Sequence, residues 1–370
     1  MKKRLLFTSY NIGSGGIGTS LINILNDIDY NKYEVTLILI SDDKTRIELI
    51  PKEVKIVFFN YKENGIIGKI KNRLKLNYYV LKYKNKFDFS ACFTPFCFNS
   101  AYIARNVCKN SNFWVHADYY TLYKEDKNKV IEFFENKKIK KFKRVIFVSE
   151  SGLNNAVKIM PYLKEKSYVC NNLLNVNTLM KKYNEEVDDP IIRENNETIF
   201  LNVSRHDEKE KSITRIIEAS KMLKEENQNF KVYLIGDGQD NKMYKDMVKK
   251  YSLENTCIFK GFKNNPYPYF KNVDAHILCS DSEGYPVVIV ETLTLKINCI
   301  STDVSDVKQI FNGNNNLLIE KSSQGVYNGM KKVIENKNLK KIDFNIDNYN
   351  NIIKEFLEKI YNDMEDKNEK

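Results

Sequence analysis

The chain has 370 residues, which is about the length of two globular domains at roughly 150 residues each. Hydrophobic residues make up 42% and aromatic residues 12% of the chain, which excludes a disordered protein, and the apolar runs are shorter than the ~20 residues of a membrane span. The net charge of +11 favours an anionic partner, such as a nucleic acid, a phosphorylated small molecule or an anionic membrane surface.

The seven cysteines are scattered through apolar segments without C-x-x-C spacing, so we interpret them as reduced core residues. The three histidines offer no group of adjacent zinc ligands. No signal peptide is expected, because the basic start leads into a short strand-like run and then a glycine-rich turn. These features together predict a cytoplasmic protein.

The first half of the chain alternates β-rich runs with helical patterns, beginning with a strand over residues 4–9 and a helix over 19–28. The second half repeats this alternation over residues 198–301. Strands joined by crossover helices form parallel sheets with helices on both faces. The sequence therefore predicts an α/β fold with two doubly wound, Rossmann-like domains.

A polar, acidic segment over residues 184–197 lacks apolar periodicity and is interpreted as the linker between the domains. An apolar stripe near the end of the chain predicts a last helix that packs back on the first domain. The predicted domains are accordingly residues 1–185 and 196–340, followed by a C-terminal helix over 345–366.

The first strand runs into Gly13-Ser14-Gly15-Gly16-Ile17-Gly18, which matches the pattern G-x-G-x-x-G. Such a turn lets backbone amides at a helix N-terminus approach a phosphate. A dinucleotide site also requires an acidic residue about 20 positions further on, and Asp42 and Asp43 come somewhat late. A phosphate-binding loop and a merely structural glycine turn therefore remain equal alternatives.

In the second half, residues 280–286 (Ser-Asp-Ser-Glu-Gly-Tyr-Pro) follow a buried strand and precede an apolar helix. Pro286 fixes the helix start and leaves nearby amides as an anion site. The amides expected there are those of Gly284, Tyr285, Val287 and Val288. Glu291 lies roughly 7 Å further along the helix, a span that suits a nucleotide sugar with Glu283 at the sugar and Glu291 at the ribose. A surface charge is the favoured explanation for either glutamate alone, and the combination with Gly284-Tyr285-Pro286 favours the site.

Two cations, Arg205 and Lys211, lie just after the strand over residues 198–203. Cations beside helix amides stabilise the charge that builds on a leaving diphosphate; the alternative is a mixed-charge surface loop. The turn Gly236-Asp237-Gly238 ends another strand and suits a base or ribose close to the backbone, or an ordinary connection.

In order and spacing, these residues resemble the large family of retaining glycosyltransferases with two Rossmann-like domains, the GT-B fold. The pattern E-x7-E of this family is realised here as Glu283 and Glu291, downstream of Arg205 and Lys211. The resemblance covers residues 198–320 well and the first half loosely. Family members include bacterial capsule, lipopolysaccharide and teichoic-acid sugar transferases.

The resemblance implies a retaining hexosyltransferase that moves a sugar from a UDP- or GDP-sugar to a hydroxyl of a glycan or lipid-linked acceptor, in cell-surface polysaccharide synthesis. It implies neither a metal nor another cofactor. The two domains would face a cleft, the first binding the acceptor and the second the donor.

Four residues carry catalytic roles by this resemblance. Arg205 and Lys211 would hold the donor diphosphate, Glu283 would meet the sugar, and His116 resembles the histidine that reaches the donor sugar from the first domain. The other donor-binding residues it implies are Gly15, Gly16, Gly236, Asp237, Gly238, Ser282, Gly284, Tyr285, Pro286, Val287 and Glu291. Asn172 looks like the asparagine that closes the first domain.

The chain departs from the family pattern in the last part of this region. Lys296 and Asn298 stand where the family usually has Gly and Pro, Ser305 and Asp306 replace a frequent Gly-Gly, and Gln309 replaces a frequent Glu. These departures concern the loop after Thr302 and leave the diphosphate cations untouched.

A basic segment over residues 62–86 has apolar residues on one helical face and lysines around the rest. The apolar residues are Ile66, Ile70, Leu74 and Leu81. A basic amphipathic helix lies on anionic lipid headgroups, which would place the protein at the inner face of the cell membrane. The alternative is a helix that packs its apolar face on the sheet and turns its lysines to solvent. No recognition motif for nucleic acid accompanies the basic residues.

Other features are interpreted as structural. Asp27-Ile28-Asp29 has the form of a metal-binding D-x-D, but it lies at a helix end, so we expect no metal there. His206 and His276 are interpreted as packing residues.

Three other classes of protein remain as alternatives. A nicotinamide-dependent oxidoreductase would use Gly13, Gly15 and Gly18 for the pyrophosphate, but it leaves the charged cluster of the second half unexplained. A nucleotide-sugar epimerase of similar fold would convert the donor with no acceptor. A silent partner subunit would bind without turnover, and the presence of Arg205 and Lys211 argues against it.

Overall fold

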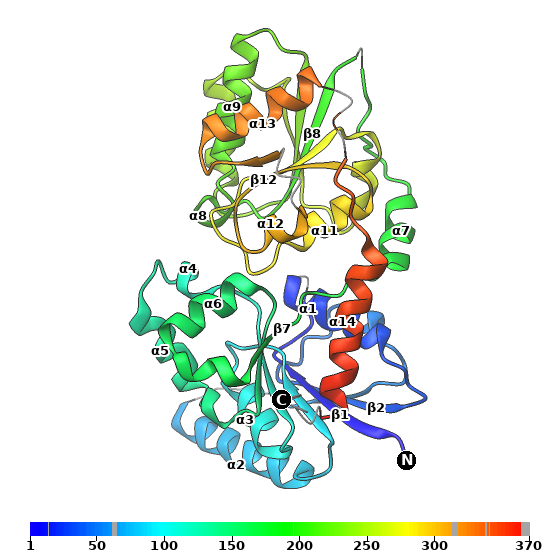
Figure 1. Cartoon of the computed structure of the whole chain (residues 1–370), viewed down its shortest axis with the longest axis vertical. Coiled ribbons are helices and arrows are strands. Elements are labelled where there is room, and N and C mark those ends of the chain that lie inside the picture. Colours follow the sequence, from blue (N-terminus) through cyan, green and yellow to red (C-terminus); the bar gives the residue numbers. More distant parts are fainter. Residues whose placement is uncertain are drawn as a thin grey trace, which may run out of the picture. The chain divides into compact units, whose positions relative to one another are not determined.

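The computed structural model describes residues 1–13, 15–60, 65–194, 196–312, 317–336, 339 and 341–363. Parts of four predictions lie outside these residues: Ser14 of the glycine loop, residues 62–64 of the basic segment, Asn195 of the linker and residues 364–366 of the last helix. The chain forms two compact units (Figure 1). Unit 1 comprises Met1–Asn175 with Asp347–Lys370, and unit 2 comprises Val176–Ile346.

The described part of unit 1 contains a parallel sheet in the order β3-β2-β1-β4-β5-β6-β7. Its strands are β1 (Lys3–Ser9), β2 (Tyr33–Leu39), β3 (Lys55–Phe58), β4 (Phe89–Cys92), β5 (Ser111–Val115), β6 (Arg144–Phe147) and β7 (Ser167–Val169). Its α-helices are α1 (Gly16–Asp27), α2 (Gly65–Tyr83), α3 (Phe98–Val107), α4 (Tyr119–Leu122), α5 (Lys127–Asn136), α6 (Glu150–Ile159) and α14 (Ile346–Tyr361). Short 3-10 turns cover Ile47–Leu49, Ile139–Lys141 and Pro161–Lys166.

The described part of unit 2 contains a second parallel sheet, in the order β10-β9-β8-β11-β12-β13. Its strands are β8 (Thr198–Val203), β9 (Phe230–Ile235), β10 (Cys257–Gly261), β11 (Ala275–Leu278), β12 (Asn298–Thr302) and β13 (Leu318–Ile319). Its helices are α7 (Val176–Asn184), α8 (Glu208–Lys211), α9 (Thr214–Glu225), α10 (Asn241–Lys250), α11 (Val287–Thr294), α12 (Val307–Ile310), α13 (Ser323–Glu335) and the 3-10 helix η4 (Tyr267–Asn272).

Each sheet buries both faces, as expected for parallel strands joined by crossover helices. In β8, Phe200 packs in a core with α9, α10 and α13, whereas its neighbours Ile199 and Leu201 pack on the other face with η4. In β1, Leu6 packs with α2 and α3, and the next residue, Phe7, contacts the ring of Tyr361 on α14. This period of two explains why the strands appear as continuous apolar runs in the sequence.

The last helix, α14, packs on unit 1. Lys354 Nζ pairs with Asp27 Oδ1 of α1 at 2.6 Å, and Asn350 bonds the backbone of Leu174. Near its end, Tyr361 is buried against Phe89 of β4. The helix therefore fastens the end of the chain to the first unit.

The boundary between the units differs from the predicted one. The chain passes from unit 1 to unit 2 after Asn175, ahead of the expected linker over 184–197. The reason is that α7 buries Leu179 and packs on η4, and Asn265 Nδ2 donates to Lys182 O at 2.8 Å. Asp189, within the expected linker, accepts from Lys263 Nζ at 2.9 Å. The segment is polar, yet it is folded onto unit 2.

Helix α2 corrects one of the two interpretations of the basic segment. Ile66, Ile70, Leu74 and Leu81 are exposed, so the apolar face does not pack on the sheet. Other residues of the helix, among them Leu76, pack in the core of unit 1. None of the helices in the described part of the chain is long and apolar enough to cross a membrane.

Candidate active site

The strand order places the predicted donor residues at one edge of the unit 2 sheet. The order reverses between β8 and β11, so the loops that follow these two strands leave the sheet at its topological switch point. Ligands of open α/β sheets bind outside the carboxyl ends of the strands at such a point. Arg205 follows β8 by two residues, and Glu283 lies in the loop after β11. Residues far apart in sequence are thus brought together by topology.

Lys211 and Glu283 form the central contact of this edge. Lys211 Nζ lies 2.6 Å from Glu283 Oε1, and the two side chains are only 15% and 14% exposed. Ser280 Oγ donates to the same carboxylate oxygen at 2.7 Å. A largely buried cation is costly without a counter-charge, and here Glu283 supplies it. Ser282, in the same loop, is half-buried.

Arg205 is much more exposed to solvent than Lys211. Its side chain is 66% exposed and pairs with Glu210 of α8 and, at 3.9 Å, with Asp207. The backbone ties α8 to the loop after β11, because the Asp281 amide donates to Glu210 O at 2.9 Å. The structure therefore separates the two predicted cations into a buried one and a surface one.

At the start of α11, one of the amides expected to bind an anion is already used within the chain. Pro286 is the N-cap residue, and no side chain of the described residues caps this helix. The Val287 amide donates to Tyr285 O at 2.9 Å, so it is already occupied and is removed from the expected anion site. Tyr285 and Pro286 are buried, and Ser305 Oγ holds Gly284 O at 2.9 Å.

Glu291 lies on α11 and accepts a hydrogen bond from Tyr267 Oη at 2.9 Å. Burial raises the pKa of its carboxyl, and the Tyr267 hydroxyl and Lys182 act in the opposite direction. Glu291 is therefore not a solvated surface charge. Its carboxyl is held in place by the Tyr267 hydroxyl.

The glycines in the turn after β9 are required by the packing of the backbone. A Cβ atom at Gly236 would come within 1.8 Å of Ser204 O, and one at Gly238 within 2.3 Å of His206 O. Gly236 also has a φ of 145°, which side chains rarely adopt. The Asp237 carboxylate accepts from the Gly238 amide at 2.8 Å. These glycines let the loops after β8 and β9 approach each other.

Unit 1 has its own switch point, between β1 and β4. Gly15 is the N-cap residue of α1, and a Cβ atom at Gly15 or Gly16 would meet no described atom within 4 Å. Packing therefore does not require these two glycines, unlike Gly18, whose Cβ would lie 2.4 Å from Gly13 O. The open backbone at the helix start is the geometry that an anion needs.

His116 follows β5 at the same carboxyl edge of the unit 1 sheet. Burial lowers the pKa of its imidazole to about 3, so the ring is neutral at physiological pH. Its ring centroid lies 4.6 Å from that of Phe93, and Nε2 is buried with no hydrogen-bond partner among the described residues. A buried imidazole nitrogen without a partner is the exception in proteins, and it is suited to a polar group of a ligand.

Sequence reasoning missed several residues at these two edges. Tyr10 and Phe96 are exposed, and their ring centroids lie 6.4 Å apart at the ends of β1 and β4. Arg46 donates from Nη1 to Gly13 O at 3.0 Å, which brings a cation to the start of α1. Tyr267 holds Glu291. None of these residues belongs to a local motif, and only the sheet order places them near the predicted ones.

At two of the positions that depart from the family pattern, the backbone keeps a conformation typical of glycine. Lys296 and Ser305, which stand at frequent glycine positions of the family, have φ values of 60° and 50°. These are left-handed conformations that glycine adopts at no steric cost. The loops thus keep the backbone shape that glycines favour, while Asn298 begins β12 and Gln309 lies in α12.

The residues interpreted as structural have contacts of that kind. His276 is fully buried, its Nε2 accepts from the Val203 amide at 3.4 Å, and its ring stacks on Phe270. His206 Nδ1 contacts Asn241 Oδ1 at 3.0 Å. Asn172 Oδ1 accepts from Ser20 Oγ at 2.6 Å near the end of unit 1.

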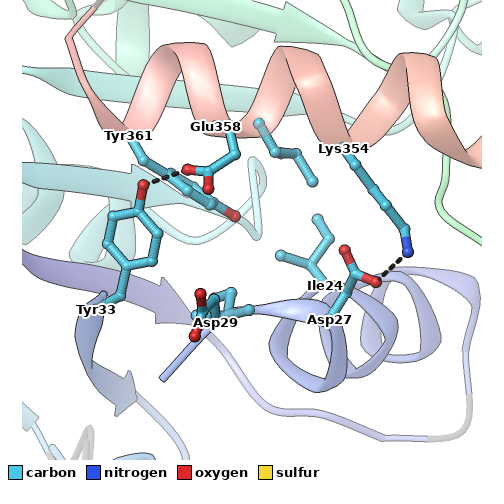
Figure 2. A pocket seen from close by; sticks show the side chains of 9 residues that line it. Ile24, Asp27, Asp29, Tyr33, Lys354, Glu358 and Tyr361 are labelled. Atoms are coloured by element: carbon cyan, nitrogen blue, oxygen red, sulfur yellow. Dashed lines mark hydrogen bonds and ion pairs between the residues drawn. The ribbon is translucent and has the colours of Figure 1, made fainter. Parts of the chain in front are cut away.

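A cavity of about 240 Å³ lies between α1 and α14 (Figure 2). Its carboxylates already have partners: Asp27 pairs with Lys354, and Glu358 accepts from the Tyr33 hydroxyl. The D-x-D-like triplet therefore helps to dock α14. In the part of the chain that the structure describes, no group of three or more His, Cys, Asp or Glu side chains is placed to hold a metal ion.

Solved structures identify the class of fold. Anabaena HepE, crystallised with UDP and glucose, superposes with a TM-score of 0.72 over 96% of this chain and 99% of its own, at 15% identity. The lipopolysaccharide outer core galactosyltransferase WaaB superposes with a TM-score of 0.66 over 97% and 96%, at 18% identity. The two Rossmann-like units thus have the GT-B fold, which confirms the predicted fold class.

The sequence comparisons show which enzymes this chain resembles. Residues 184–350 match the family model of glycosyl transferases group 1. An uncharacterised glycosyltransferase of Methanocaldococcus jannaschii is 26% identical over 69% of this chain, a match that spans 65% of the relative's length. A Campylobacter jejuni enzyme is 24% identical over 90% of both chains; it is named as the N-acetylgalactosamine-N,N'-diacetylbacillosaminyl-diphospho-undecaprenol 4-alpha-N-acetylgalactosaminyltransferase. Together these findings support a GT-B glycosyltransferase of group 1.

Proposed function

We propose that this glycosyltransferase moves a hexose from a UDP- or GDP-sugar to a hydroxyl of a glycan or lipid-linked acceptor, with retention at the anomeric carbon. The observation that carries the proposal is the largely buried Lys211–Glu283 pair at the switch point of unit 2. A lysine held at this position with a carboxylate at 2.6 Å is suited to exchange that carboxylate for a diphosphate.

The exchange gives both residues a role. When the diphosphate binds Lys211, the cation keeps a counter-charge and the free energy cost of burying it alone is avoided. Glu283 is then released to accept hydrogen bonds from hydroxyls of the donor sugar, with Ser280 still orienting it. As the bond to the sugar breaks, charge on the leaving diphosphate grows and its attraction to Lys211 increases.

Arg205 supports the same step from the surface. Its pairs with Glu210 and Asp207 are exposed, so the guanidinium can leave them at little cost in free energy. A guanidinium binds phosphate oxygens in a bidentate manner, which a lysine cannot do. We expect Lys211 to contribute more to the rate than Arg205, because it is less exposed to solvent and its electrostatic interactions are stronger.

The rest of the donor extends along α11 and the neighbouring turns. Glu291, oriented by Tyr267, accepts hydrogen bonds from two adjacent ribose hydroxyls, and Gly236, Asp237 and Gly238 line the base or ribose. Gly284, Tyr285 and Pro286 border the sugar and diphosphate. Val287 contributes by its position only, since its amide is used within the chain.

Unit 1 receives the acceptor in this proposal. As the family resemblance implies, its neutral His116 offers Nε2 to a hydroxyl of the donor sugar, and Gly15 and Gly16 leave an open helix start for a donor phosphate. The exposed rings of Tyr10 and Phe96 provide an apolar surface beside them. The front-face attack of the acceptor hydroxyl is assisted by the leaving diphosphate, which accounts for retention without a covalent nucleophile.

Relatives support the chemical classes of donor and acceptor. HepE was crystallised with UDP and glucose, and the Campylobacter relative is named for a diphospho-undecaprenol-linked substrate. We therefore assign this protein to cell-surface polysaccharide synthesis, in the cytoplasm and at the inner face of the membrane. We assign the charge stabilisation to Lys211 and Arg205 and expect no metal requirement, so turnover with EDTA should equal turnover without it.

The experiment that tests the proposal is a screen of nucleotide sugars for release of UDP or GDP, first alone and then with glycan and polyprenyl-diphosphate acceptors. The expected result is slow hydrolysis of one donor, acceleration by an acceptor, and an anomeric configuration in the product that NMR shows to be retained. Interconversion of the donor sugar with no acceptor would identify an epimerase. A rise in melting temperature with NAD and none with UDP or GDP would identify an oxidoreductase.

A further inference from the structure

Helix α2 turns its most apolar side away from unit 1. Six large apolar side chains on this side are between 56% and 79% exposed: Ile66, Ile67, Ile70, Leu74, Tyr78 and Leu81. At about 100° per residue they lie within about 120° of the helix circumference. The buried residues Leu76 and Tyr83 lie on the opposite side of the helix. We call the six exposed residues the α2 stripe.

Basic side chains border the α2 stripe on both edges. By the same helical geometry, Lys69 and Arg73 lie along one edge and Lys71, Lys75 and Lys82 along the other. The sequence of α2 contains no aspartate and no glutamate. An apolar strip bordered by cations therefore extends from Ile66 to Leu81, or about 24 Å along the helix.

Aromatic rings hold some of these cations in place. The Arg73 guanidinium lies 4.8 Å from the ring centroid of Tyr102 on α3, and Lys75 Nζ lies 5.0 Å from that of Phe59. Helix α2 is also packed beside α3, and the Tyr102 hydroxyl donates to Asn77 Oδ1 at 3.0 Å. Helix α2, which carries the stripe, is thus held on unit 1 (Figure 1).

We infer that the α2 stripe inserts into the headgroup region of an anionic lipid bilayer. A long, convex apolar strip matches a planar surface, and the complementary partner of two cationic rows is a layer of anionic phosphates. A contiguous exposed apolar patch of this length is rare on a protein surface without a partner. The inference rests on the proposed function only where it names the lipid-linked acceptor as the reason for docking.

Further contacts connect this surface with the edge of the unit 1 sheet. On α3, the ring of Tyr102 lies 6.0 Å from that of Phe98, by centroids. Phe98 follows two residues after Phe96, which contacts Tyr10 at the end of β1. Aromatic side chains therefore lie between α2 and the proposed acceptor residues Tyr10 and Phe96. Docking through α2 brings this path close to the lipid phase.

The test is co-sedimentation of the full chain with vesicles of phosphatidylglycerol and phosphatidylcholine, compared with phosphatidylcholine alone. We expect binding to the anionic vesicles and loss of about 100-fold in affinity for the triple variant Ile70→Ser, Leu74→Ser and Leu81→Ser. A matched control is Ile352→Ser, which alters a side chain of α14 that is 61% exposed. The control should bind as the unchanged protein does.

The charges are tested separately with Lys69→Gln, Lys71→Gln and Lys75→Gln. Each basic residue near an anionic surface contributes about fivefold in affinity, so the three together should cost about 100-fold at low salt and much less at high salt. Lys249→Gln with Lys250→Gln, on α10 of unit 2, is the control for a general loss of positive charge.

Transfer to a water-soluble acceptor separates this inference from the proposed function. The α2 variants should keep that activity and their melting temperature, and Lys211→Ala should keep vesicle binding. The inference is overturned if the unchanged protein does not bind anionic vesicles, or if the stripe variant binds them equally well. It is also overturned if sedimentation velocity shows a dimer that the stripe variant dissociates, because a second copy would then cover the stripe.

Discussion

The two switch points of this protein share a topology and differ in chemistry. At the edge of unit 2, Lys211 and Glu283 form an ion pair with little exposure to solvent, and Arg205 adds a surface cation. At the edge of unit 1, the imidazole of His116 is neutral and the rings of Tyr10 and Phe96 are exposed. Sheet order thus places both candidate sites, whereas the loops decide their chemistry: an ion pair with little solvent exposure in unit 2, and in unit 1 an open helix start together with a neutral imidazole and exposed aromatic rings.

The largest expected effect is that of Lys211→Ala. Removing the cation that stabilises the leaving diphosphate should lower kcat by about 10²–10³-fold, the typical effect of losing one charge-stabilising group. Lys209→Ala is the matched control, since Lys209 lies on the same short helix and is exposed. Steady-state rates of UDP or GDP release measure both variants. Equal rates in the two variants would remove the charge-based account of unit 2.

Substitution of the aromatic pair of unit 1 should raise the KM for the acceptor and leave the KM for the donor unchanged. Tyr10→Ala with Phe96→Ala is expected to raise the KM for the acceptor about tenfold, because it removes the apolar surface that the acceptor contacts. Donor KM should stay within a factor of two. Phe262→Ala alters an aromatic side chain of unit 2 that is 62% exposed and serves as the control. A change in donor KM instead would contradict the division between the units.

Glu291→Gln should weaken donor binding more than it slows the chemistry. The amide keeps one acceptor oxygen but loses charge-assisted bonds to the ribose, so we expect a rise in donor KM of about fivefold with little change in kcat. Tyr267→Phe, which frees Glu291 from its hydrogen bond at 2.9 Å, should give a smaller rise. An unchanged donor KM in both variants would place the ribose elsewhere.

Each unit also buries a histidine whose protonation opposes folding. Burial lowers the pKa of His116 in unit 1 and of His276 in unit 2 to about 3, against an ordinary value of 6.5. The unfolded chain therefore binds protons below about pH 6.5 that the native state does not bind until its pKa near 3. The free energy of unfolding should therefore decrease as the pH is lowered through this range, by up to about 1.4 kcal/mol per pH unit for each histidine.

Urea unfolding between pH 7 and pH 5 measures this dependence, ahead of the range in which most carboxylates titrate. His276→Gln should remove its share of the slope, and the loss of buried stacking should lower stability at pH 7. If the slope stays as steep in the variant, His276 is not the group that opposes folding at low pH.

The sequence was sufficient for the fold class and for the motifs, because strand periodicity and E-x7-E are local patterns. It was insufficient for contacts that depend on topology. The Lys211–Glu283 pair spans 72 residues, and the Tyr10–Phe96 pair joins two neighbouring strands that are not consecutive in the chain. For α2, the same amphipathic pattern fits a helix packed by its apolar face and a helix packed by the other face. Only the fold decides between them.

The predicted linker failed for a related reason. Residues 184–197 are polar, which is typical of connections, yet Asp189 pairs with lysines of unit 2 and α7 precedes it in the same unit. Polar composition does not distinguish a free segment from one held by ion pairs on a surface.

The central claim is that a donor diphosphate replaces Glu283 on Lys211, and titration calorimetry with UDP on the Glu283→Gln variant tests it most directly. If the carboxylate competes with the diphosphate for Lys211, the variant binds UDP several-fold more tightly than the unchanged protein, while its sugar transfer falls. Weaker or equal binding of UDP by Glu283→Gln, with Lys211→Ala binding UDP normally, would contradict the claim.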